Sequence, residues 1–75
     1  MGKLPQVRPI QAERAILKDG WFFARSGRGS HRHYLHPSKP GVVTISFHPG
    51  PIRIWTLRSI IRQAALTEQQ FLALL

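Results

Sequence analysis

The sequence predicts an α+β domain of two layers, in which helices cover one face of a three-stranded antiparallel sheet. Apolar residues recur at helical spacing towards both ends of the chain. Between them lie three short runs rich in aromatic and β-branched residues, separated by turns that contain glycine or proline. Such short connections favour an antiparallel meander, and the helices must then cover one sheet face. The 75 residues suffice for a single domain with a small core, which we place over residues 1–75.

Residues 1–8 show no periodicity and are expected to form a loose lead-in. Pro9 suits the first position of a helix, because the hydrogen bond that proline cannot donate is not needed there. The apolar spacing that follows predicts a helix over residues 9–19. Gly20 is a natural C-terminal stop for this helix.

Three strands are expected next, over residues 21–25, 30–36 and 42–47. A glycine-rich turn over residues 26–29 joins the first two strands. A turn over residues 37–41, which contains two prolines, joins the second strand to the third.

Alternation along the middle strand places Tyr34 on one face and both His31 and His33 on the other. Leu35 shares the face of the histidines. Alternation alone leaves open which face is buried, and a bulge beside Gly29 would change the assignment. The outer strands are expected to supply four side chains to the buried face: Trp21, Phe23, Val43 and Ile45.

An irregular stretch follows, after which Thr56 can cap a second helix. Residues 67–70 form a capping box for a short C-terminal helix. The order is therefore helix, three-stranded antiparallel sheet, helix and short helix. The buried stripe of the second helix is expected to comprise Leu57, Ile60, Ile61, Ala64 and Ala65.

Positive charge is the strongest global feature of the sequence, with eleven Lys and Arg residues against three acids and a formal net charge of +8. No acid lies between Gly20 and Thr67. Arginine, which predominates among the cations, is suited to bidentate phosphate contacts. A nucleic acid is therefore the leading interpretation of the partner. The alternatives are a basic surface that serves only solubility and one that meets an acidic protein.

The sequence lacks cysteine, which excludes disulfides and thiolate metal sites. No stretch approaches the roughly 20 apolar residues of a membrane helix, and the N-terminus lacks an apolar signal core. We therefore expect a soluble, cytoplasmic protein that needs no cofactor.

His31, His33 and His36 lie within six residues, and this cluster limits the possible chemistry. Their spacing matches no standard zinc site, and no acid in this part of the sequence can hold Mg²⁺. RNA carries its own nucleophile, the 2′-OH, which attacks the adjacent phosphate once a base removes its proton. Histidine, with an ordinary pKa of about 6.5, suits that transfer at neutral pH, and arginine stabilises the charge that builds on phosphorus oxygens. The cluster thus favours RNA over DNA, and a structural role for each single histidine stays open.

Seven motifs in this sequence resemble the HicA toxin family of bacterial type II toxin–antitoxin systems, over about residues 4–71. They are Asp19-Gly20-Trp21, Arg25, Gly29-Ser30-His31, Tyr34, His36-Pro37, residues 41–45 and residues 56–64. The resemblance implies a fold similar to double-stranded-RNA-binding domains and a ribosome-independent mRNA interferase. It places the catalytic histidine at His31, with Gly29 and Ser30 in its motif. It also implies a HicB antitoxin as the protein partner that covers the active surface.

The sequence therefore leads to the hypothesis of a metal-independent endoribonuclease toxin with His31 as general acid or base. The second proton-transfer group is left open between His33 and Tyr34. Two rival hypotheses are a non-catalytic RNA-binding module of the same fold and a protein-interaction domain for an acidic partner. The residues expected to contact RNA are Arg28, Gly29, Ser30, Arg32, Lys39 and Arg58.

Some positions depart from the family pattern. Trp55 stands where the family usually has glycine before the capping threonine, and Ala65 replaces a common glycine. Ser46-Phe47 occupies a place where proline is frequent, and residues 49–55 lack the lysines often seen there. These differences affect the loop and its contacts with RNA, and they leave the His31 motif intact.

Overall fold

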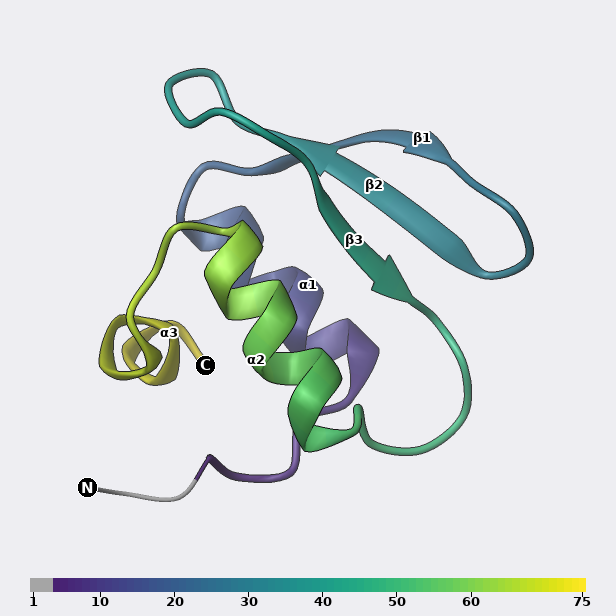
Figure 1. Cartoon of the computed structure of the whole chain (residues 1–75), viewed down its shortest axis with the longest axis vertical. Helices are drawn as coiled ribbons and strands as arrows, with labels where there is room; N and C mark the ends of the chain where they lie inside the picture. The colour runs from purple at the N-terminus through teal and green to yellow at the C-terminus, as the bar shows by residue number, and fades with distance from the viewer. Residues whose placement is uncertain (1–3) are drawn as a thin grey trace.

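The computed structural model describes residues 4–75, and its elements follow the predicted order. They are α1 (Pro9–Lys18), β1 (Phe22–Ser26), β2 (His31–Leu35), β3 (Val43–Ser46), α2 (Ile54–Gln63) and α3 (Glu68–Leu74). The strands form one antiparallel sheet in the order β1-β2-β3, and the helices gather on one side of it (Figure 1). This α+β arrangement is consistent with a double-stranded-RNA-binding-domain-like fold. Within residues 4–75, no helix is long and apolar enough to cross a membrane.

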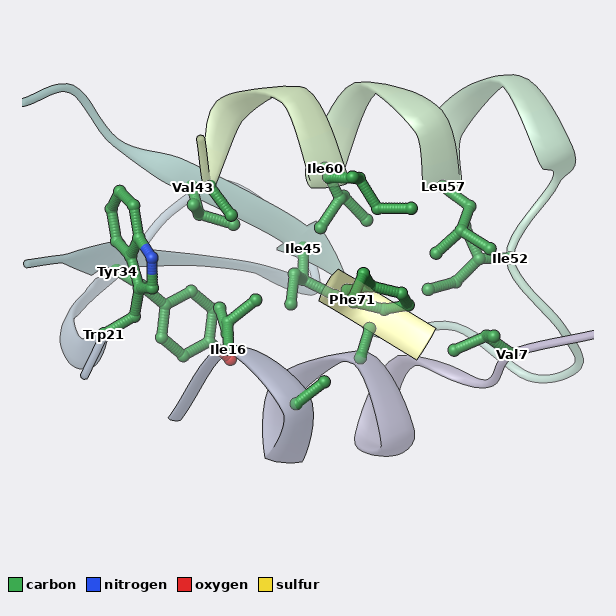
Figure 2. Close-up of a cluster of buried hydrophobic side chains, with 14 residues drawn as sticks. Val7, Ile16, Trp21, Tyr34, Val43, Ile45, Ile52, Leu57, Ile60 and Phe71 are labelled. Carbon is green, nitrogen blue, oxygen red and sulfur yellow. The ribbon is translucent and has the colours of Figure 1, made fainter. Parts of the chain in front are cut away.

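The core lies between the helices and the sheet face that they cover (Figure 2). Val43 and Ile45 of β3 are fully buried on this face, and Trp21, just before β1, is almost as deeply buried. The expected burial of these three residues is confirmed. Burying a large apolar side chain contributes roughly 1.5–3 kcal/mol, so this cluster drives folding. The remaining members are Val7, Ala12, Ala15, Ile16, Tyr34, Ile52, Leu57, Ile60, Ile61, Ala64 and Phe71.

The expectation that Phe23 joins the buried face is wrong, because this side chain is 49% exposed. Phe23 pairs with Tyr34 in the strand register, and the two rings meet edge to face with centroids 6.1 Å apart. However, β1 is an edge strand, and α1 and α2 pack against β3 at the opposite edge. Alternation thus predicted the correct face of β1, but the helices do not extend far enough to cover it.

The segment before α1 contributes a core residue that the sequence analysis missed. Val7 is buried, and its carbonyl oxygen accepts a hydrogen bond from the Ile52 N–H at 2.7 Å. This contact ties the start of the chain to the segment before α2, where the sequence predicts a loose lead-in over residues 1–8. A single valine between polar neighbours has no periodicity and therefore gives no signal. The lead-in residues 1–3 lie outside the described part of the chain.

The capping predictions have mixed outcomes. The capping box of α3 is confirmed, because the Thr67 hydroxyl accepts a hydrogen bond from the Gln70 N–H at 3.0 Å. The predicted cap of α2 is wrong: Thr56 lies inside the first turn, and Arg53 occupies the cap position. Residues 52–55 contain neither proline nor glycine, so nothing in the backbone prevents the helix from beginning three residues earlier.

The helices α1 and α2 end in the same backbone motif, with glycine in one and alanine in the other. At each helix end, the N–H of the first residue after the C-cap donates a hydrogen bond to the carbonyl three residues earlier in the chain. The N–H of the next residue donates to the carbonyl five residues earlier. These hydrogen bonds are 3.0–3.1 Å long. This Schellman motif needs a positive φ angle, which is +106° at Gly20 and +55° at Ala65. Ala65 is therefore exposed beyond the end of α2. The expectation that it belongs to the buried stripe is wrong.

Replacing Ala65 by glycine is expected to stabilise the protein. At a positive φ angle, glycine avoids the steric strain that alanine carries. This relief outweighs the greater conformational freedom of glycine in the unfolded chain, so the free energy of unfolding should rise by about 0.5–1 kcal/mol. The matched change Gly20→Ala should act in the opposite sense, because the new Cβ would also lie 2.8 Å from His36 Nε2. Urea denaturation measures both values. A lower free energy of unfolding in Ala65→Gly would show that Ala65 is not strained.

Candidate functional site

Strand β2 presents its side chains to two different environments. Tyr34 is fully buried against the helices, so His31 and His33 lie on the opposite, uncovered face of the sheet. The predicted separation of Tyr34 from the two histidines is confirmed. The structure also settles which face is buried, and we call the uncovered one the open face.

His31 is held at the start of β2 by the turn that precedes it. The Gly27 N–H donates a hydrogen bond to the His31 carbonyl at 2.8 Å, and the His31 N–H donates to the Arg28 carbonyl at 3.1 Å. Gly29 between them has a φ of +58°, a conformation that favours glycine. The backbone of His31 is therefore fixed on both sides while its side chain stays exposed.

His33 lies two residues further along the same face and is only partly exposed. Its Nδ1 is 2.8 Å from Thr44 Oγ1 on β3, which orients the ring. A Cβ atom at Gly27 would clash with His33 Nε2 and would lie 3.3 Å from His31 Cβ. Only glycine at this position leaves room for the ring. The side chains of His31 and His33 thus both lie next to Gly27.

Arg25 is a site residue that the sequence analysis did not select. The register of β1 against β2 shifts between Phe23 and Arg25, so Ala24 is extra and Arg25 pairs with His33. Paired residues share a face of an antiparallel sheet, and Arg25 therefore joins the histidines on the open face. Without the bulge, simple alternation would direct it towards the helices. The sequence left open a bulge beside Gly29 only, and nothing in the local sequence marks its position at Ala24.

The turn before His31 adds further polar groups next to the open face. Arg28 is exposed in this turn. The Ser30 hydroxyl lies 3.3 Å from the hydroxyl of Ser46, and Ser46 is the register partner of His31. Five predicted or newly found residues therefore lie on the open face or in the turn that borders it: Arg25, Arg28, Ser30, His31 and His33.

Arg32 lies on the other side of the sheet. It donates a hydrogen bond to Glu13 of α1 at 3.0 Å, and Tyr34 donates a hydrogen bond to the same carboxylate oxygen. The Arg32 guanidinium also stacks over the Phe47 ring, 4.4 Å from its centroid. The hydrogen bond to Glu13 raises the pKa of Arg32. Arg32 thus links the sheet to α1 and does not share a face with His31.

The other two cations predicted to contact RNA also lie beside acids. Lys39 Nζ is 2.6 Å from Asp19 and 3.0 Å from the Ala64 carbonyl, so it bridges the ends of α1 and α2. Arg58 Nε is 3.3 Å from Glu68 on an exposed surface, and such a pair contributes little to stability.

A comparison with known families identifies the family of this chain. A sequence model described as the HicA toxin of bacterial toxin–antitoxin systems matches residues 11–66, most of the chain. The chain belongs to the HicA toxin family. No curated protein matches it. The matched span includes the complete sheet, α2 and the turn that carries His31, so the resemblance noted in the sequence is confirmed.

His36 has a structural role in this HicA chain. Its Nε2 lies 2.8 Å from the Asp19 carbonyl oxygen, which can only accept, so Nε2 carries the proton. Its Nδ1 accepts hydrogen bonds from the backbone N–H groups of Ser38 and Lys39. The ring also packs edge to face on Trp21, with centroids 5.2 Å apart. The structural role that the sequence left open for each histidine is therefore the role that the structure supports for His36.

The chemistry of the open face is that of imidazole, guanidinium and hydroxyl groups. Imidazole can accept and donate protons at neutral pH, and exposed guanidinium groups can bind phosphate. Within residues 4–75, no three His, Asp or Glu side chains lie close enough together to hold a metal ion. A cleft of about 330 Å³ is lined by other residues, namely 4–6, 51–54 and 57.

The contact between Tyr34 and α1 predicts a pH dependence of stability. Burial, together with the hydrogen bond to Glu13, raises the pKa of Tyr34 above its ordinary value of 10.0. Above about pH 10 the unfolded chain releases this proton while the folded protein retains it, so stability that is complete below that pH is lost as the pH rises. Urea denaturation between neutral and alkaline pH should show a smaller alkaline loss in Tyr34→Phe than in the native protein. Equal alkaline losses of stability in the two proteins would show that Tyr34 is not the group responsible.

Proposed function

We propose that this HicA chain is a toxin that acts as a metal-independent, ribosome-independent endoribonuclease on mRNA, with His31 as the general base. The observation that carries the proposal is the position of His31: exposed, fixed by its turn, and on the open face beside a second imidazole. Membership of a family of mRNA-cleaving toxins supports the same reading.

In the proposed reaction the substrate supplies the nucleophile. The His31 imidazole removes the proton from a ribose 2′-OH, and the 2′-oxygen forms a bond to the adjacent phosphorus. The bond from phosphorus to the 5′-oxygen then breaks, and that oxygen takes a proton from a general acid. The products are a 2′,3′-cyclic phosphate and a 5′-OH. General acid and general base contribute typically 10²–10⁴-fold each.

We assign the general acid to His33. The side chains of His31 and His33 both lie next to Gly27. The Nδ1 of His33 contacts Thr44, so its Nε2 is the nitrogen that can donate a proton to the leaving oxygen. Tyr34, the other candidate from the sequence, is buried on the helix-covered face and has its hydroxyl on Glu13.

For phosphate binding we propose Arg28 with the backbone of Gly29 and Ser30, and we add Arg25, which faces His33. Arg58 extends the basic surface on α2. Arg32 and Lys39 hold carboxylates within the fold, and for this reason we give them structural roles. The protein partner is a HicB-type antitoxin, which would act on the toxin in the cytoplasm by covering the open face.

The role of His31 in catalysis is tested by its removal. His31→Ala should abolish cleavage of single-stranded RNA and relieve growth arrest, while circular dichroism and RNA binding stay as in the native protein. The native enzyme should cut in EDTA and leave cyclic phosphate ends, detected by mass spectrometry. The matched control is His48→Ala, which removes another exposed imidazole and should retain activity. Full cleavage by His31→Ala, or strict dependence on Mg²⁺, would overturn the mechanism.

A change of leaving group separates the role of His33 from that of His31. His33→Ala should lower kcat on RNA by about 10²-fold or more, with little change in KM, because only proton transfer is lost. On uridine 3′-(4-nitrophenyl phosphate), whose leaving group needs no proton, His33→Ala should regain most of its activity and His31→Ala should not. Equal defects of His33→Ala on both substrates would exclude the role of general acid.

A further inference from the structure

Trp55 is the most exposed large apolar side chain that the structure describes. It is 75% exposed on the first turn of α2, whereas Trp21, the other tryptophan of the sequence, is 2% exposed. Leaving an indole in water gives up the favourable burial that a ring of this size can supply. A role outside the fold is the natural explanation for such a position.

The surroundings of Trp55 are basic. The Arg58 guanidinium lies over the Trp55 ring, 5.6 Å from its centroid, and Arg53 precedes the helix. Arg62 follows Arg58 one turn later on the exposed side of α2. The sequence has no acid between Gly20 and Thr67, and Glu68 beyond α2 already contacts Arg58. An aromatic face among guanidinium groups is the combination that binds single-stranded nucleic acid.

The path of the chain connects this surface to the open face. Phe47, just after β3, donates its N–H to the carbonyl of Ser30, the neighbour of His31, at 2.9 Å. From there residues 47–53 form a curved loop that leads to the start of α2 (Figure 1). The nine residues from Phe47 to Trp55 span at most about 32 Å. A single RNA strand of a few nucleotides can therefore reach from His31 to Trp55.

We propose that Trp55 is a stacking platform for an unpaired base of the RNA, outside the cleaved linkage, with Arg53 and Arg58 contacting the flanking phosphates. The proposal rests on the RNA binding of the proposed function and adds a subsite to it. Stacking on an indole accepts every base, so the subsite contributes affinity without strong sequence preference. An acidic protein partner at the same surface is the competing occupant, and the test below distinguishes the two.

The test measures RNA binding in the His31→Ala background, where cleavage does not interfere. Trp55→Ala should weaken the affinity for a short oligouridylate about tenfold, and Trp55→Phe should retain most of it. An oligomer of the same length without bases should bind both proteins equally. Leu17→Ala, which removes an exposed apolar side chain from α1, is the matched control and should bind like the parent. The Trp55 side chain makes little contact with the core, so thermal unfolding of these variants should match the parent.

Tryptophan fluorescence gives an independent readout, because Trp55 is accessible to acrylamide and Trp21 is buried. Oligouridylate should protect the accessible tryptophan from quenching, and the baseless oligomer should not. Unchanged RNA affinity in Trp55→Ala would overturn the proposal, as would an equal loss of affinity for the baseless oligomer. A Trp55→Ala variant that loses only the antitoxin would assign the surface to the protein partner and would also overturn it. Failure of the catalytic proposal would appear separately, as cleavage that survives His31→Ala.

Discussion

The burial of Tyr34 determines the orientation of the functional side chains. Its ring lies in the core and reaches towards α1 (Figure 2). Its hydroxyl donates a hydrogen bond to Glu13 of α1. Because side chains alternate along a strand, this single fixed residue directs both His31 and His33 to the open face. A slip of the register by one residue would place the imidazoles in the core and the tyrosine in solvent. The stability of the core and the accessibility of the site are thus two consequences of one constraint.

The charged side chains include two groups, those that form ion pairs and those that lie on or beside the open face. Each of the three acids of the sequence contacts a cation: Glu13 contacts Arg32, Asp19 contacts Lys39, and Glu68 contacts Arg58. The first two pairs join α1 to the sheet and to the end of α2. Arg25 and Arg28, on and beside the open face, are left to attract an anion together with the nearby imidazoles. A small, strongly basic chain therefore uses two of its three acids, Glu13 and Asp19, to hold the fold together and leaves positive charge where RNA would bind.

Much of the fold could be predicted from local patterns. Helical periodicity, Pro9 and Gly20 defined α1, and alternation in β2 separated Tyr34 from the histidines. Effects that depend on tertiary contacts could not be predicted in this way. The exposure of Phe23 depends on how far the helices reach, and the burial of Val7 depends on a hydrogen bond to Ile52 that is distant in sequence.

Prediction of the candidate site was limited in the same way, by contacts that form only in the folded protein. His31 stood out through its motif and its arginine neighbours, but Arg25 reaches the open face only through a bulge that its sequence does not mark. Conversely, Arg32 and Lys39 looked like phosphate ligands because their acids, Glu13 and Asp19, are 19 and 20 residues away along the chain. Charge counted along a sequence cannot show which cations the folded protein has already paired.

The account depends most on the claim that the ribose hydroxyl of the substrate is the nucleophile, activated by an imidazole on the open face. The direct measurement compares an RNA oligomer with the same oligomer carrying 2′-O-methyl groups throughout, both in EDTA, for binding and for cleavage. We predict similar binding of the two oligomers and cleavage of the unmodified RNA alone. Cleavage of the methylated oligomer at a comparable rate would show that another nucleophile attacks the phosphate, and would contradict the account.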